Sequence, residues 1–130
     1  MPNLKSTILV VEDDHSTRVA LREALEGGGY TVVTVTNGLD AIRHLKTHQP
    51  HPSLILLYWG MPLMNGAEFL GARAAFGEEL KKIPVALMSG SQIPEPFVKE
   101  VSGLLKKPVS LDDLIRSVER FLVFDVPPAR

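Results

Sequence analysis

The sequence contains no cysteine, and its 130 residues include only one tryptophan and two tyrosines. Without cysteine there is no disulfide framework, no thiolate metal site and no cysteine nucleophile. The apolar runs, such as Ile8–Val11 and Leu54–Leu57, are far shorter than the roughly 20 residues needed to span a bilayer. The first residues carry no apolar segment typical of a signal peptide. We therefore expect a cytoplasmic protein that does not bind a membrane.

The sequence also lacks an excess of charge of either sign, because it contains 14 Lys and Arg residues and 15 Asp and Glu residues. Nucleic-acid binding requires a basic face that displaces counterions, so no nucleic-acid partner is expected. The length and the 45% hydrophobic content are typical of one globular domain. We expect this domain to cover residues 7–122, with flexible tails at 1–6 and 123–130.

Short β-branched or leucine-rich runs alternate with segments of helical apolar spacing along the whole chain. This alternation predicts parallel βα units, in which helices cover both faces of one sheet. The five predicted strands lie near Ile8–Val11, Tyr30–Val35, Leu54–Leu57, Val85–Met88 and Leu104–Leu105.

Polar residues that cap helices mark the starts of several predicted helices. Gly27–Gly29 supplies the left-handed turn that ends the first helix, and Pro50 and Pro52 close the second. The predicted caps are Ser16 or Thr17 for the first helix, Asn37 with Asp40 for the second and Ser110 with Asp113 for the last. Pro94 and Pro96 leave only Phe97–Val101 for the fourth helix, which should be short or irregular.

Ligands of an open parallel sheet bind at the carboxyl ends of its strands. Adjacent carboxylates favour a hard cation such as Mg²⁺, although an acidic run after a strand is equally typical of a solvated helix start. The residues that follow the strands are Glu12–Asp14, Tyr58–Pro62, Ser89 with Gly90, and Lys107 with Pro108.

These segments resemble the receiver domain of bacterial two-component response regulators, and the resemblance covers roughly Thr7 to Leu122. The motifs that carry it are the acidic pair Glu12–Asp13, the loop Met61–Gly66, the switch position Ser89, and Lys107–Pro108. The resemblance implies a doubly wound, flavodoxin-like sheet with strand order 2-1-3-4-5. It also implies a histidine kinase or other signalling protein as partner, and phosphoryl transfer to an aspartate after strand three, assisted by Mg²⁺. Ser89 and Lys107 would contact the phosphoryl oxygens.

The position that matches the phosphoacceptor aspartate holds Tyr58. A phenol with a pKa of about 10 is mostly protonated at neutral pH and cannot form an acyl phosphate. We therefore expect no catalytic residue and only weak Mg²⁺ binding, through Glu12, Asp13 and the carbonyl of Gly60. Leu104 replaces the aromatic residue that usually lies three positions before the lysine, so the family's inward switch should be lost.

The main hypothesis is therefore a receiver domain that has lost its phosphoacceptor and acts as a phosphorylation-independent protein-interaction module, not an enzyme. An alternative keeps the domain in a phosphorelay, with Asp13 or Asp14 as acceptor, although Asp14 could simply cap the first helix. A nucleotide or flavin binder is disfavoured, because acidic residues after strand one would repel a phosphate. The sequence leaves the oligomeric state open.

Three histidines, His44, His48 and His51, follow helical spacing near the end of the second helix. A shared metal would need all three on one helical face. Pro50 and Pro52 should break that face before His51, so surface histidines are expected. Trp59 is expected to pack within its loop.

Overall fold

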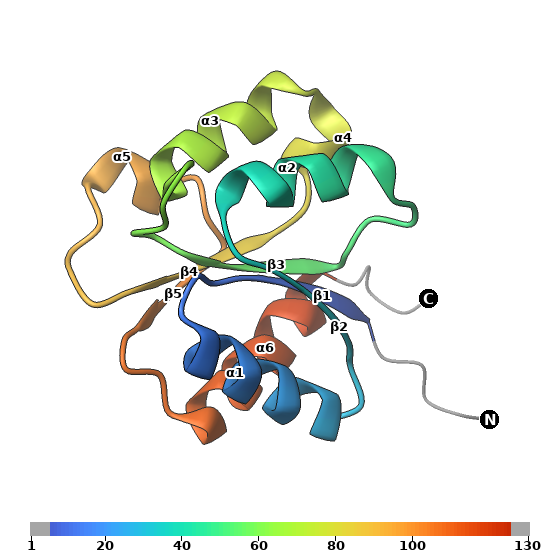
Figure 1. Ribbon diagram of the computed structural model, residues 1–130, viewed down its shortest axis with the longest axis vertical. Coiled ribbons are helices and arrows are strands. Elements are labelled where there is room, and N and C mark those ends of the chain that lie inside the picture. The colour runs from blue at the N-terminus through green and yellow to red at the C-terminus, as the bar shows by residue number, and fades with distance from the viewer. Residues whose placement is uncertain (1–5, 126–130) are drawn as a thin grey trace.

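The computed structural model describes residues 6–125, and side chains are described up to residue 122. The described chain alternates strands and helices, as predicted (Figure 1). The strands are β1 (Thr7–Val11), β2 (Thr31–Val35), β3 (Leu54–Tyr58), β4 (Val85–Ser89) and β5 (Gly103–Lys106). The helices are α1 (His15–Gly27), α2 (Gly38–Thr47), α3 (Gly66–Ala75), α4 (Glu78–Lys81), α5 (Glu95–Val98) and α6 (Leu111–Asp125).

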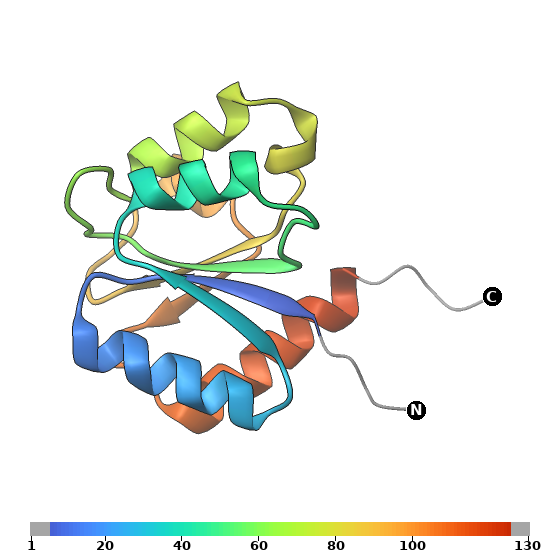
Figure 2. The same ribbon diagram turned by 45° about the vertical axis from the view of Figure 1, so that its right-hand side comes forward.

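The five strands form one parallel sheet in the order β2-β1-β3-β4-β5. Parallel neighbours require crossover connections, and the helices of these crossovers cover both faces of the sheet. Helices α1 and α6 lie on one face, and α2, α3, α4 and α5 lie on the other (Figures 1 and 2). The doubly wound fold and its strand order are therefore confirmed.

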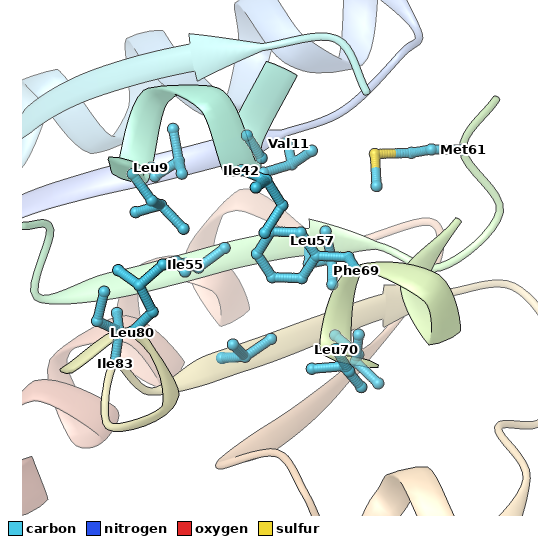
Figure 3. Packing of buried hydrophobic residues seen from close by; sticks show 14 of the residues in the cluster. Leu9, Val11, Ile42, Ile55, Leu57, Met61, Phe69, Leu70, Leu80 and Ile83 are labelled. Carbon is cyan, nitrogen blue, oxygen red and sulfur yellow. The ribbon is translucent and has the colours of Figure 1, made fainter. Parts of the chain in front are cut away.

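Residues on each strand alternate between two hydrophobic cores, one on each face of the sheet. Leu9, Val11 and Leu57 face α2 and α3, where they pack with Phe69 and Ile42 (Figure 3). Their neighbours along the strands belong to the other core, beside α1 and α6; they are Ile8, Val10, Leu54 and Leu56. Burial on both faces explains why β1 and β3 are continuous apolar runs in the sequence.

The helix boundaries confirm two predicted caps and correct a third. Asn37 caps α2 by accepting a hydrogen bond from the Asp40 amide at 2.8 Å, and Ser110 accepts one from the Asp113 amide at 3.1 Å. The prediction of Ser16 or Thr17 for α1 was wrong. The other interpretation, that Asp14 caps this helix, is confirmed: its carboxylate accepts hydrogen bonds from the amide and hydroxyl of Thr17. At the other end of α1, Gly29 takes the left-handed backbone angle expected of the glycine run, with φ of 97°.

The fourth predicted helix is short, but it lies at Glu95–Val98 (α5) and not at 97–101. Its start follows Pro94, because proline is tolerated in the first turn of a helix. The sequence did not predict α4, a single turn before β4. No helix within residues 6–125 is long and apolar enough to cross a membrane.

The last helix, α6, continues to Asp125, three residues past the predicted domain boundary. The expected flexible tails were residues 1–6 and 123–130, and of these, residues 1–5 and 126–130 lie outside the described residues.

Candidate functional site

The carboxyl ends of β1, β3, β4 and β5 meet at one edge of the sheet. Backbone hydrogen bonds hold these ends side by side: Trp59 N–H donates to Met88 O at 2.9 Å, and Lys107 N–H donates to Ser89 O at 2.8 Å. The edge therefore gathers the residues that directly end or follow these strands. Among them, Glu12, Tyr58 and Lys107 form a contiguous cluster of side chains.

Lys107 lies at the centre of this cluster. Its ammonium nitrogen is 2.7 Å from Glu12 Oε1 and 3.6 Å from the centroid of the Tyr58 ring. The Lys107 side chain is only 20% exposed, whereas the neighbouring Lys106 is exposed. The lysine that lies inside the site is therefore the one before Pro108, in line with the expectation from sequence.

Glu12 is a fully buried carboxylate. Its Oε2 accepts a hydrogen bond from the Asp14 amide at 3.2 Å. The contact of its Oε1 with Lys107 is an ion pair without the geometry of a directed hydrogen bond. Arg18 donates to the Glu12 carbonyl oxygen at 3.0 Å, so the segment after β1 is also held from α1. A buried charge is tolerated when it is paired and hydrogen-bonded, and Glu12 meets both conditions.

The ring of Tyr58 is half-buried, with the Lys107 ammonium over it and Gly60 close to its hydroxyl end. A Cβ atom placed on Gly60 would lie 3.2 Å from the Tyr58 hydroxyl oxygen and 3.3 Å from Cζ. The missing side chain at Gly60 therefore leaves the space that the phenol occupies. Tyr58 also packs against the hydrophobic cores on both faces of the sheet.

The Ser89 hydroxyl is engaged within its own loop. It donates to the Ser91 carbonyl oxygen at 2.8 Å and accepts from the Ser91 amide at 3.1 Å. Ser89 is buried, and its pairing with Ser91 was not predicted, because no motif marks it in the sequence. Among the described residues, the Ser89 hydroxyl forms no hydrogen bond with Lys107 or Tyr58.

The two remaining acidic residues of the loop are exposed. Asp14 serves as the cap of α1, and the hydrogen bonds from the Thr17 backbone and side chain lower the pKa of its carboxyl group. Asp13 lies between Glu12 and this cap. The weak Mg²⁺ site expected at Glu12, Asp13 and the Gly60 carbonyl stays a prediction. No group of three or more histidines and acids within residues 6–122 is arranged to hold a metal ion.

Leu104 is 49% exposed on β5. It borders a groove of about 660 Å³ between β4, β5 and α5. The ring of Trp59 packs edge-on against Phe97 of α5, with ring centroids 5.2 Å apart. Trp59 therefore has a packing role, as expected, but its ring partner Phe97 lies on α5 and outside its own loop.

The histidines near the end of α2 do not share one face. His44 and His48 stack with ring centroids 4.2 Å apart. His51 lies beyond the end of the helix, with Nε2 3.1 Å from the Leu45 carbonyl oxygen. Burial, followed by the proximity of His48, lowers the pKa of His44.

Sequence comparison matches residues 8–119 to the model of the response regulator receiver domain. The response regulator receiver protein CpdR of Brucella abortus is 32% identical over 117 residues, which are 89% of this chain and 96% of that protein. The polar-differentiation response regulator DivK of Brucella ovis is 25% identical over 123 residues, 92% of this chain and 98% of that protein.

Solved structures support the same assignment. The signal receiver domain of a histidine kinase from Syntrophus aciditrophicus has a TM-score of 0.81 and 28% identity, and the match covers 97% of this chain and 96% of that one. The chemotaxis response regulator CheY4 of Vibrio cholerae has a TM-score of 0.78 and 26% identity, with 90% and 98% covered. The sheet order and the matched sequence agree: this chain belongs to the response regulator receiver domain family.

Proposed function

We propose that this receiver domain is a phosphorylation-independent interaction module in two-component signalling. Receiver domains are signalling modules that interact with histidine kinases and other signalling proteins, and they typically bind Mg²⁺ at an acidic phosphorylation site. The observation that carries the proposal is Tyr58 at the end of β3, where the family resemblance expects the phosphoacceptor aspartate. The Lys107 ammonium lies over its ring, and Gly60 lies close to its hydroxyl end.

The chemistry of the acceptor supports the loss of phosphotransfer. An acyl phosphate forms when an ionised carboxylate attacks phosphorus, and Tyr58 offers no carboxylate. The groups that would stabilise a phosphoryl group are also committed elsewhere. Lys107 pairs with Glu12, and the Ser89 hydroxyl is bonded to Ser91.

The alternative acceptors after β1 are less suitable. The Asp14 carboxylate caps α1. Transfer of a phosphoryl group to this carboxylate would remove the acceptor of the two hydrogen bonds from Thr17. Asp13 is also exposed but does not cap α1, so it stays the stronger of the two alternatives.

The groove beside Leu104 is the surface we propose for partner contact. It combines apolar side chains with the exposed edge strand β5, and α5 is too short to cover it. Leu104 has no hydroxyl group that could form a hydrogen bond and couple its position to that of Ser89. The surface of the groove would therefore be the same whether or not a kinase is active. The partner that we propose is a cytoplasmic protein. We propose no binding to nucleic acid or to a membrane.

Intact-mass spectrometry after incubation with a small acyl phosphate and Mg²⁺ tests the proposal. We expect no phosphoryl adduct on the natural chain, while Tyr58→Asp is the matched variant that restores a carboxylate. An acid-labile adduct on the natural chain would overturn the proposal. Loss of that adduct in Asp13→Ala or in Asp14→Ala would then identify the acceptor.

A further inference from the structure

We infer that the Lys107 ammonium takes the place of the divalent cation at this sheet edge, so that Mg²⁺ binds well only after Lys107 is removed or withdrawn. The inference rests on the proposed function, because it explains how the site is held in one state without phosphorylation. It assigns the weak Mg²⁺ binding that we expect to Lys107 as well as to the missing carboxylate at position 58.

The oxygen donors present do not fit a Mg²⁺ ion while Lys107 is in place. Mg²⁺ requires near-octahedral oxygen ligands at about 2.0–2.1 Å, usually one or two carboxylates with several waters. Glu12 is 0% exposed, and both of its carboxylate oxygens are engaged, one by Lys107 and one by the Asp14 amide. Asp13 and Asp14 are both exposed, but the Asp14 carboxylate caps α1, which leaves Asp13 as the exposed carboxylate of this loop that caps no helix.

The charges at the site also disfavour Mg²⁺ binding while Lys107 is in place. Glu12 is neutralised by an ammonium 2.7 Å away in a site with little solvent. A divalent ion close enough to contact Glu12 would also lie close to this ammonium, and like charges repel strongly where water is scarce. Mg²⁺ and Lys107 are therefore competitors for one carboxylate.

Tyr58 keeps Lys107 in this position. An ammonium over the face of an aromatic ring is stabilised by the ring's quadrupole, and the Nζ-to-centroid distance of 3.6 Å is within the range of this interaction. A carboxylate at position 58 would compete with Glu12 for the ammonium, whereas the phenol leaves the pair with Glu12 intact. Glu12, Tyr58 and Lys107 thus form one neutralised unit.

Mg²⁺ titration at constant ionic strength, followed by Trp59 fluorescence and by calorimetry, tests the inference. We expect Lys107→Gln to bind Mg²⁺ about tenfold or more tightly than the natural chain, even though Tyr58 is retained. Lys106→Gln is the matched control, because it removes the same charge from the exposed neighbour. Adding Glu12→Gln to Lys107→Gln should abolish the gain.

Thermal unfolding establishes that each variant is folded. If Lys107→Gln does not fold, Glu12→Asp is the second variant, because its shorter side chain withdraws the carboxylate from Nζ and should also strengthen Mg²⁺ binding. Equal Mg²⁺ affinity in the folded variant and the natural chain would overturn the inference. A phosphoryl adduct on the natural chain would overturn the proposed function instead, so the two failures are distinguishable.

Discussion

The Lys107 ammonium lies 2.7 Å from the fully buried Glu12 carboxylate and joins the end of β5 to the end of β1. Removal of one partner of a buried ion pair leaves a charge without compensation. Because Lys107 is 20% exposed, water recovers part of this loss. We expect Glu12→Gln to lower the free energy of unfolding by about 2 kcal/mol, measured by urea unfolding.

The control for this variant is Asp13→Asn, which neutralises the adjacent exposed carboxylate. It should change stability by less than about 0.5 kcal/mol. Equal effects of the two variants would show that the ion pair contributes nothing specific to stability.

Gly60 provides the space for the Tyr58 ring, because a Cβ atom there would lie 3.2–3.3 Å from the hydroxyl oxygen and Cζ. We expect Gly60→Ala to destabilise the natural chain by about 1 kcal/mol through overpacking. In the Tyr58→Asp background the shorter side chain removes the contact, and the same change should be close to neutral. A double-mutant cycle measures this coupling, and purely additive effects would contradict the contact.

Gly66 allows close packing of Trp59 at the start of α3. A Cβ atom on Gly66 would lie 2.5 Å from Trp59 Cε3 and 3.2 Å from its Cα atom. We expect Gly66→Ala to displace the indole, shift the fluorescence of this single tryptophan and cost about 1–3 kcal/mol. Gly71→Ala, on an open part of the same helix, is the control and should leave the fluorescence unchanged.

His44 should make stability depend on pH. Burial lowers its pKa below the ordinary value of 6.5, so the unfolded chain binds a proton that the folded chain does not. The free energy of unfolding should therefore fall as the pH decreases from 6.5 toward the pKa of the folded state, with the full contribution present above 6.5. Unfolding measured across this range should show a smaller decrease in His44→Gln. An identical decrease in both proteins would exclude His44 as the source.

Much of the fold followed from the sequence because its strands are apolar runs bounded by turn residues. The runs at Ile8–Val11 and Leu54–Leu57 are buried on both faces, so their pattern is strong. The short helix α4 was not foreseen, because four residues are too few for a helical apolar period. The cap of α1 was ambiguous in the sequence because Asp14, Ser16 and Thr17 are all good capping residues, and the backbone angles identify Asp14.

For the candidate site, the sequence was sufficient to predict which strand ends lie side by side. The parallel strands bring Glu12, Tyr58 and Lys107 to one edge of the sheet, independently of their side-chain conformations. The stacking of Lys107 on Tyr58 and the turning of the Ser89 hydroxyl toward Ser91 depend on side-chain rotamers and local loop geometry. These contacts could not be predicted from the sequence pattern. The proposal that the site works without phosphorylation depends on them.

Solution NMR tests the central claim most directly, by comparing amide spectra of the natural chain with and without a small acyl phosphate and Mg²⁺. Our account predicts that the amides of Ser89, Leu104 and Lys107 keep their positions in the natural chain. Tyr58→Asp is the control that offers a carboxylate under the same conditions. Shifts of these amides in the natural chain that appear with the acyl phosphate and disappear after its hydrolysis would contradict the account.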